Sequence, residues 1–543
     1  MPAGWAVALA LLALALKLAL LLTSQSAPDG DEAIIGLMAL HVTHGSHPLF
    51  LYGQNYDAGA GVLAHAAGVV FSVAGASGMA LKAVALVVWL ALVAAATLAL
   101  RRAAGTTSAR SAALLLLFCP TTVEWAMKAR GGHMLAALAI VIALACAWGA
   151  LERQTAHGGG GSVVLFGLSA AAAPWLHPSV LPAALALTGG VVVALGAQRR
   201  LKALLVIAVI QAAVTLPATF LAHDPAWSPA HFVGLGVPFE PGRFFLTVLP
   251  ALFTPDLDWS IPPAPSAIVA VGWLWLMASI LSLAWLSAQC ARQRGSVPQG
   301  LLILTALAVL TIGIAVDFHF AGPYPLLAFY PLACLVMGLA AGPCAALHPR
   351  QARLVLALLL LSGVGVHVAA LGGATVHGAG EQQRRFPAAW VTEMLADLEQ
   401  HQVTCVFSES PMLPWNLMFQ SRERVAARWL TARDRWQPYV DRVNAAFNRG
   451  ERCALLLRLQ ATTKRFRQLQ TYAANHPQQV SFFGDRYALL YDPSRELIRA
   501  EFAFDDAVAE HGDGTPVLPG LWSRAAAGHL AMLPSLSCFR NFQ

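Results

Sequence analysis

Three carboxylates follow directly on the first apolar run of the chain. Residues 27–36 read APDGDEAIIG and contain Asp29, Asp31 and Glu32. Crowded like charges raise the pKa of one of the carboxyl groups, which brings it toward the range of a general base. Asp29 followed three residues later by Glu32 also matches a capping box, and acids favour the positive end of a helix dipole. Capping explains Asp29 and Glu32 but not Asp31, so catalysis and capping both stay open for this cluster.

Further titratable side chains follow later in the chain. His41, His44 and His47 recur at every third position and could meet on one helical face to bind a metal ion. However, a glycine follows His44, so the helix could end there, and ordinary interfacial histidines explain the pattern better. No metal ligand is therefore assigned, although dependence on a divalent cation stays open. Glu124 precedes Lys128 by four residues, and we expect it to pair with a base because an unpaired charge in a membrane span is costly.

The composition indicates that lipid is the main solvent of this chain. Of its 543 residues, 57% are hydrophobic and only 12% are charged, whereas soluble domains carry about 25% charged residues. The formal net charge is +7, but the basic residues of positions 1–372 form short clusters between apolar runs. Such clusters are typical of orientation signals in membrane proteins. These features favour a polytopic membrane protein and give little support to nucleic-acid binding.

A helix that spans a membrane needs about 20 largely apolar residues. The sequence predicts eleven such spans: 4–23, 80–100, 111–127, 133–150, 162–176, 179–197, 203–222, 266–288, 300–316, 325–342 and 354–372. Clusters of Lys and Arg fall in alternate gaps between them, and acidic residues gather in the opposite gaps. The positive-inside rule then predicts a cytoplasmic N-terminus and an outer C-terminus.

Two outer loops follow from this topology. Residues 24–79 contain the apolar stretches 33–42 and 60–79, which suit helices lying along the membrane interface. The loop 223–265 is rich in Pro, Trp and Phe and is long enough for a lid or a substrate-facing loop. Its aromatic side chains could stack on a sugar or anchor the loop at the interface.

The chain from residue 373 onward has a different character. Strand-like stretches such as VTCVFSES and RCALLLRL alternate there with polar helical stretches, which predicts a small α/β domain. Cys405 and Cys453 lie in two of the strand-like stretches and could form a disulfide if this domain is oxidised.

Several stretches resemble integral-membrane glycosyltransferases of the GT-C fold, specifically bacterial members related to family 39. Protein O-mannosyltransferases and the lipid A aminoarabinose transferase belong to the wider group. DGDEAIIGLMALHVTHGSHPLFLYGQNYDAG is similar to their first outer loop, where an acidic pair follows the first span, and KARGGH (128–133) also resembles bacterial members. FAGPYPLLAFYP resembles a stretch near a late span, but His319 and Phe320 stand where Arg-Tyr is common. The resemblance covers the transmembrane part and, more weakly, the outer domain.

The resemblance implies a donor in which a sugar is attached to a polyprenyl phosphate. Asp31 and Glu32 match the acidic pair, so Asp31 is implied as the base that takes the acceptor proton. Glu32 then orients the acceptor or serves as a second acid. The leaving phosphate needs positive charge, for which we select Lys128, Arg130 and His133; snorkelling to the interface is the alternative for the two bases. Inversion by direct displacement is also implied.

Further candidate substrate-binding residues come from the first outer loop and the late span. A role at the interface is the simpler explanation for Asp57, and a structural role is the simpler one for His319. The candidates are Asp29, Tyr52, Gln54, Asn55, Tyr56, Asp57 and His319.

The sequence therefore predicts a mainly α-helical GT-C-like membrane module of about eleven transmembrane helices (1–372), followed by an extracytoplasmic α/β domain (373–543). We expect a glycosyltransferase that uses a polyprenyl-phosphate-linked sugar at the periplasmic face of the bacterial inner membrane, with a glycan, lipid or protein acceptor and no certain cofactor. A transporter or flippase of lipid-linked sugars is the alternative, and it predicts charged residues deep within the spans. A scaffold whose outer domain binds a partner is another, and it predicts that Asp31→Asn leaves function intact.

Overall fold

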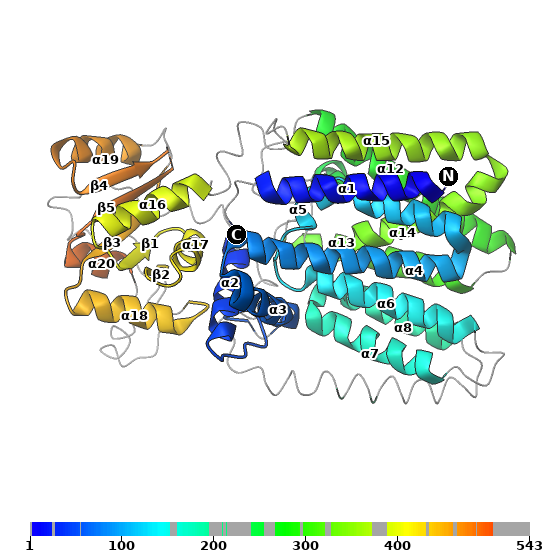
Figure 1. Ribbon diagram of the computed structural model, residues 1–543, viewed down its shortest axis with the longest axis horizontal. Helices are drawn as coiled ribbons and strands as arrows, with labels where there is room; N and C mark the ends of the chain where they lie inside the picture. The colour runs from blue at the N-terminus through cyan, green and yellow to red at the C-terminus, as the bar shows by residue number, and fades with distance from the viewer. Residues whose placement is uncertain are drawn as a thin grey trace.

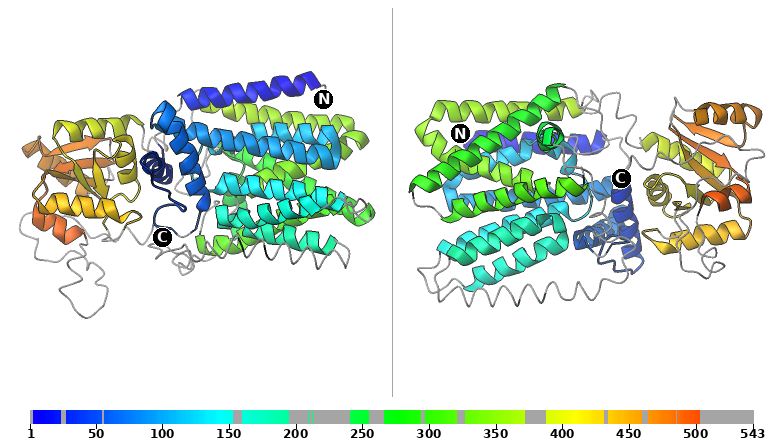
Figure 2. Two further views of the ribbon diagram at one scale, coloured as in Figure 1. Left: turned by 60° about the horizontal axis from the view of Figure 1, so that its bottom comes forward. Right: turned by 180° about the vertical axis from the view of Figure 1, so that it is seen from behind.

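The computed structural model describes residues 3–23, 28–54, 56–152, 160–194, 209, 213, 241–254, 266–293, 297–320, 327–371, 388–430, 434–459, 464–484 and 486–502. Long helices lie side by side in a bundle, and a C-terminal domain (388–502) lies beyond one end of it (Figure 1). Two further helices, α2 and α3, lie between the bundle and this domain, as the views of Figure 2 show.

The bundle consists of apolar helices. They are α1 (Ala3–Thr23), α4 (Gly78–Phe118), α6 (His133–Glu152), α7 (Gly160–Leu176), α8 (Leu181–Ala194), α12 (Ser266–Gln293), α13 (Val297–Phe320), α14 (Phe329–Leu347) and α15 (Pro349–Leu371). Shorter helical segments are α5 (Thr122–Trp125), η2 (Pro178–Val180), α10 (Pro241–Arg243), η4 (Phe244–Val248) and α11 (Leu249–Ala251). Among the described residues, six helices are long and apolar enough to cross a membrane. The chain is therefore a multi-pass membrane protein.

With one exception, the predicted spans coincide with helices wherever the structure describes them. The span 203–222 lies largely outside the described residues, so the count of eleven stays a prediction. The span 80–100 and the first part of the span 111–127 fall within α4, which is two helices that meet at Gly105. The backbone there has φ 82° and ψ 179°, a conformation that glycine adopts readily and other residues avoid.

One predicted span extends too far. Residues 111–127 were expected to form a single helix, but the helix ends at Phe118. Pro120 explains the early end, because the residue before a proline is pushed out of the helical region. Cys119 accordingly has φ −54° and ψ 127°. The chain then passes through α5 to α6, and this passage carries the bases of the candidate site.

Small residues let the bundle helices approach closely. A Cβ on Gly338 of α14 would lie 2.4 Å from the Cβ of Ala112 in α4, and a Cβ on Gly363 of α15 would lie 2.1 Å from the carbonyl oxygen of Phe118. Close approach of backbones at small residues is a common way to pack helices in a bilayer.

The first outer loop contains the two helices that were expected in it. These are α2 (Gly30–Thr43) and α3 (Ala58–Ala74). The C-terminal domain packs on α2: a Cβ on Gly36 would lie 2.6 Å from the ring of Phe419, and one on Gly30 would lie 2.5 Å from Met412 Sδ. The start of α2 is thus enclosed by the bundle on one side and by the C-terminal domain on the other.

The C-terminal domain is the predicted small α/β domain. Its mixed sheet has the strand order β2-β1-β3-β5-β4, with β1 parallel to β2 and β3, and β5 antiparallel to β3 and β4. The strands are β1 (Cys405–Ser408), β2 (Ala426–Arg428), β3 (Cys453–Arg458), β4 (Val480–Phe483) and β5 (Tyr487–Tyr491). The helices are α16 (Ala388–Gln400), α17 (Leu413–Gln420), α18 (Gln437–Asn448), α19 (Lys464–Asn475) and α20 (Arg495–Glu501).

The disulfide between Cys405 and Cys453, which the sequence left open, is present. The two residues are partners in register on the neighbouring strands β1 and β3, with their Cα atoms 4.8 Å apart. The predicted domain boundary at 372/373 falls among residues 372–387, outside the described part of the chain. Within the loop 223–265 the structure describes only 241–254.

Candidate active site

The three carboxylates lie where α2 begins. Asp29 is the N-cap, and its Oδ1 accepts a hydrogen bond from the backbone N–H of Glu32 at 2.9 Å. In return, Glu32 Oε2 accepts one from the backbone N–H of Asp29 at 3.0 Å. The predicted capping box is therefore confirmed, and it fixes the direction in which the chain enters α2. Asp31 takes no part in this box.

Asp31 lies between two guanidinium groups that come from distant parts of the chain. Arg130 donates from Nε to Oδ2 at 3.0 Å, and Arg435 of the C-terminal domain donates from Nη1 to Oδ1 at 2.8 Å. The side chains of Asp31, Arg130 and Arg435 are only 14%, 18% and 13% exposed. These ion pairs are thus partly shielded from water, which strengthens their attraction.

Glu32 is buried and fixes the segment that follows α5. Its side chain is 3% exposed, and Lys82 Nζ lies 3.2 Å from Oε1. Oε1 also accepts a hydrogen bond from the backbone N–H of Ala129 at 3.0 Å. We call residues 128–132 the KARGG segment. The contacts of Glu32 hold this segment against α2, while its catalytic role stays a prediction.

Lys128 and Arg130 reach the carboxylates from the KARGG segment. Lys128 Nζ lies 2.7 Å from Glu124 Oε1 and 3.2 Å from Asp29 Oδ2, so the expected pairing of Glu124 with a base is confirmed. Arg130 Nη1 lies 3.7 Å from the same oxygen of Asp29. Burial acts to raise the pKa of Asp29, but the charges of Lys128 and Arg130 outweigh it and lower the pKa overall.

Acidic and basic side chains balance at this place, which we call the ionic cluster. It contains the acids Asp29, Asp31, Glu32 and Glu124 and the bases Lys82, Lys128, Arg130 and Arg435. Burial of charge is tolerated because each group has a partner of opposite sign. An anionic ligand that enters the cluster therefore competes with a carboxylate for a base.

Asp57 supports the KARGG segment from the side of α3, of which it is the N-cap. Its Oδ1 accepts a hydrogen bond from the backbone N–H of Gly132 at 2.6 Å. A Cβ on Gly131 would lie 2.3 Å from Asp57 Oδ2, and one on Gly132 would lie 2.1 Å from the carbonyl oxygen of Leu176. The paired glycines thus permit the close approach of the segment to Asp57. Burial raises the pKa of Asp57 to about 7.

Tyr52 joins the first outer loop to the C-terminal domain. Its ring stacks on Trp436 with centroids 4.0 Å apart, and its hydroxyl hydrogen-bonds to His41 Nδ1. The other ring nitrogen of His41 lies 2.9 Å from Glu423 Oε1, which also accepts from the hydroxyl of Tyr439 at 2.7 Å. This contact region lies beside Arg435 in sequence and helps to position it.

The residues that follow Tyr52 in the first outer loop differ in their contacts and burial. A Cβ on Gly53 would lie 2.6 Å from the Cα of Arg435, so the loop is packed against that residue. Burial, together with nearby acids, raises the pKa of Tyr56 to about 12, although the charge of Arg435 opposes the shift. Gln54 is half-buried, and Asn55 lies outside the described residues.

His133, the third predicted phosphate ligand, packs against other rings and makes no ion pair of the ionic cluster among the described residues. The ring of His133 lies 3.6 Å from that of His177, centroid to centroid, and 5.9 Å from that of Trp125. His319 lies near the end of α13, and its side chain is outside the described part of the structure.

The three histidines of the first outer loop each contact different residues, so they do not form one cluster. His41 bonds to Tyr52 and Glu423, His44 is the C-cap of α2, and His47 stacks on His65 at 5.7 Å. Among the residues described, no group of three or more His, Cys, Asp or Glu side chains could hold a metal ion.

Sequence reasoning missed two bases of the cluster, Lys82 and Arg435. A signal for Lys82 existed, because it is an isolated base at the outer end of the predicted span 80–100, the side that the positive-inside rule disfavours. No comparable signal marks Arg435, which lies 404 positions from Asp31.

Solved structures of two kinds of protein share this fold. ArnT from Cupriavidus metallidurans in the apo state has a TM-score of 0.58 at 15% identity, over 90% of this chain and 98% of that chain. The same protein bound to undecaprenyl phosphate has a TM-score of 0.58 at 15% identity, over 91% and 99%. The apo oligosaccharyltransferase of Archaeoglobus fulgidus has a TM-score of 0.51 at 13% identity, over 84% of this chain and 70% of that chain.

No family model matches the chain, and no curated protein matches it in sequence. The structural similarities confirm the GT-C fold that the sequence predicts. At such low identity they establish the fold alone, so the activity has to be argued from the residues of this chain.

Proposed function

We propose that this protein is a membrane glycosyltransferase that moves one sugar from a polyprenyl-phosphate-linked donor to an acceptor. The ionic cluster carries the proposal, because it brings the carboxylate of Asp31 and the bases Lys128 and Arg130 together at one end of an apolar bundle. Such a donor has a lipid tail that membrane helices can hold and a sugar that reacts outside the lipid. ArnT, which shares the fold, has been captured with undecaprenyl phosphate, and this supports the donor class.

In the proposed reaction the acceptor hydroxyl attacks the anomeric carbon of the sugar from the face opposite the phosphate. The bond from this carbon to the acceptor oxygen forms while its bond to the phosphate oxygen breaks, so the configuration inverts. Asp31 takes the proton that the acceptor loses. The polyprenyl phosphate leaves with the electron pair, and Lys128 and Arg130 stabilise its charge through charge-assisted hydrogen bonds.

The contacts of Asp31 suggest an order of binding. Each of its oxygens accepts a hydrogen bond from a guanidinium group, so departure of one group gives an acceptor hydroxyl more room at the carboxylate. The donor phosphate competes with Asp31 for Arg130, because phosphate binds guanidinium strongly. The donor therefore binds first, draws Arg130 from Oδ2, and leaves that oxygen open to the acceptor.

We place this reaction at the periplasmic face of a bacterial inner membrane, with the C-terminal domain in the periplasm. The distribution of Lys and Arg along the sequence supports this orientation. The disulfide between Cys405 and Cys453 supports it independently, because disulfides persist in oxidising compartments. Since the C-terminal domain supplies Arg435 to the cluster, it is also placed to select the acceptor.

The test is consumption of lipid-linked sugars by the purified full-length protein with candidate acceptors. Asp31→Asn removes the base but keeps the size of the side chain, and we expect at least about 100-fold slower turnover. Binding of undecaprenyl phosphate should persist in this variant. Asp441→Asn, which makes the same change at an exposed position on α18, is the control and should react at the normal rate.

Two outcomes would count against the proposal. Near-normal turnover by Asp31→Asn would remove this residue as the base. A lipid-linked sugar that binds but is recovered chemically intact with every acceptor would favour the transporter alternative.

A further inference from the structure

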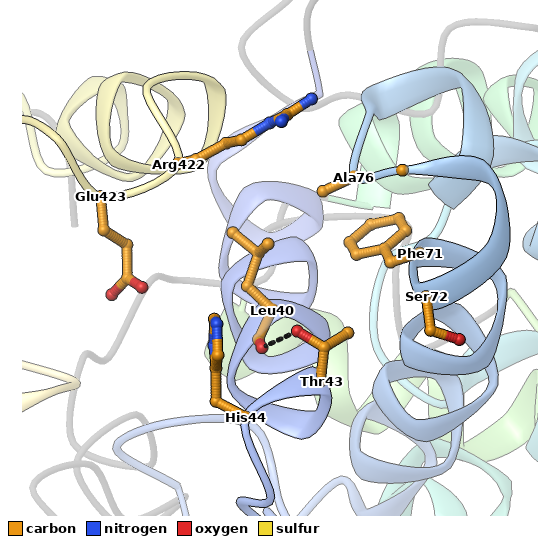
Figure 3. A pocket seen from close by; sticks show the side chains of 9 residues that line it. Leu40, Thr43, His44, Phe71, Ser72, Ala76, Arg422 and Glu423 are labelled. Atoms are coloured by element: carbon orange, nitrogen blue, oxygen red, sulfur yellow. Dashed lines mark hydrogen bonds between the residues drawn. The ribbon is translucent and has the colours of Figure 1, made fainter.

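A pocket lies near the C-terminal end of α2, away from the ionic cluster, between α2, α3 and the C-terminal domain (Figure 3). Its volume is about 420 Å³, which is within the range of sites for small ligands. Its lining residues are Leu40, Thr43, His44, Phe71, Ser72, Gly75, Ala76, Arg422 and Glu423. None of them belongs to the proposed catalytic site.

The walls of the pocket are largely apolar in character. Leu40 comes from α2 and Phe71 from α3, and they face the pocket from two sides. The two hydroxyl groups of the walls donate to their own helices: Thr43 Oγ1 to the carbonyl of Leu40 at 2.6 Å, and Ser72 Oγ to that of Val69 at 2.8 Å. The walls therefore suit a hydrocarbon group better than a polar one.

The helix that forms one wall also exposes an apolar face. Val62, Val69 and Val73 of α3 are 46%, 68% and 88% exposed. They are seven and four positions apart and thus share one side of the helix. A helix at a membrane interface turns such a face toward lipid. Ser72, which lines the pocket, follows Val69 by three positions, so this face lies beside the pocket.

The guanidinium of Arg422 lies at the opening of the pocket. Arg422 is exposed and extends across the opening toward Ala76, as Figure 3 shows. Within the described part of the chain its guanidinium has no ion-pair partner. The carboxylate of Glu423 points away from it and is bonded to His41 and Tyr439. The positive charge of Arg422 is therefore the one that faces an incoming ligand.

Arg422 occupies a backbone position at which glycine would be less strained. The helix α17 ends in a Schellman motif, with Glu423 N–H bonded to the carbonyl of Met418 at 2.8 Å and Arg422 N–H to that of Phe419 at 3.0 Å. Arg422 has φ 51°, in the left-handed region that glycine usually fills in this motif. An arginine kept under such strain suggests that its side chain is used.

We propose that this pocket binds an anionic membrane lipid. The phosphate of the lipid pairs with Arg422, and the upper part of one acyl chain packs on Leu40 and Phe71 inside the pocket. The valine face of α3 meets the surrounding lipid. A cation above a largely apolar cavity, beside an exposed apolar helix face, is complementary to this amphiphile in both charge and polarity. The bound lipid ties the C-terminal domain to the membrane surface, and this role does not depend on the proposed transfer reaction.

The experiment uses the intact protein in an uncharged detergent. Phosphatidylglycerol or phosphatidylcholine is titrated in, and bound lipid is counted by native mass spectrometry. Arg422→Gln should weaken the apparent affinity for phosphatidylglycerol roughly fivefold, the effect of one cation at a membrane surface, and leave phosphatidylcholine unaffected. Arg424→Gln is the matched control, because Arg424 is 72% exposed and pairs with Glu399 instead, and it should bind normally.

A second variant separates lipid binding from folding. Arg422→Gly removes the guanidinium but relieves the strain, so we expect the same loss of affinity together with a higher unfolding temperature in lipid-free detergent. A purely structural Arg422 would not move the two readouts in opposite directions. The proposal is overturned if Arg422→Gln binds phosphatidylglycerol normally, if Arg424→Gln loses as much affinity, or if the unaltered protein binds phosphatidylcholine as tightly as phosphatidylglycerol.

Discussion

Replacing Gly132 by alanine should displace the KARGG segment and the bases that it carries. The new Cβ would lie 2.1 Å from the carbonyl oxygen of Leu176 and 2.8 Å from Asp57 Oδ1. The first neighbour is backbone, and the second is an oxygen that already accepts the N–H of Gly132 at 2.6 Å. Neither can move aside easily, so the segment itself must shift.

The magnitude follows from these two contacts. Overpacking of a close-packed site costs about 1–3 kcal/mol, and loss of the hydrogen bond to the buried Asp57 costs about 1–3 kcal/mol more. Gly132→Ala should therefore lower the free energy of unfolding by about 2–6 kcal/mol. Because Arg130 is two residues away, a displacement of about 1 Å should also slow turnover about 100-fold.

Thermal unfolding followed by tryptophan fluorescence, and consumption of a lipid-linked sugar, measure the two effects. Gly149→Ala in α6, the helix that follows the KARGG segment, is the control, because its Cβ would meet only Ser162 Oγ, at an ordinary 3.5 Å. A Gly132→Ala protein as stable and active as the wild type would refute the described packing of the KARGG segment on Asp57.

Three further predictions concern the surroundings of the cluster. Burial raises the pKa of Asp57 to about 7, so between about pH 4 and pH 7 the folded state keeps a proton that the unfolded chain has lost. Stability should therefore fall by up to about 1.4 kcal/mol per unit as the pH rises to about 7, and Asp57→Asn should abolish this slope in thermal unfolding. Lys82→Met leaves the buried Glu32 without its cation and should destabilise the protein by about 3–5 kcal/mol in the same assay; a double variant with Glu32→Gln that recovers none of this loss would contradict the pairing. Trp436→Ala removes the stack on Tyr52 and should weaken the contact of the C-terminal domain by about 1 kcal/mol, detectable as faster hydrogen exchange in α2 and α18.

The helical part of the fold could be predicted because it follows from local composition. A run of apolar residues long enough to cross a bilayer specifies a helix wherever it occurs, and α1, α6 and α12 lie where their apolar runs lie. The turn at Gly105 was also predictable from the basic residues around it. By contrast, β2 is only three residues long, and its pairing with β1 is a tertiary contact that no local pattern shows.

The same distinction between local and long-range contacts holds for the candidate site. The capping box of Asp29 and Glu32 depends on a spacing of three residues, so the sequence was sufficient to predict it. The partners of Asp31 lie 99 and 404 positions away, and spacing cannot reveal them. Arg130 was selected because the KARGG segment resembles a stretch of the family. Arg435 could be assigned only from the structure, in which the C-terminal domain packs on α2.

The contribution of Arg435 limits how this protein can be divided. Without the C-terminal domain, the acids of the ionic cluster would outnumber its bases by one, four against three. A membrane module made alone would thus present surplus negative charge where an anionic lipid phosphate has to arrive. Exchange of C-terminal domains between proteins of this fold should succeed only where the incoming domain delivers a cation to the same place.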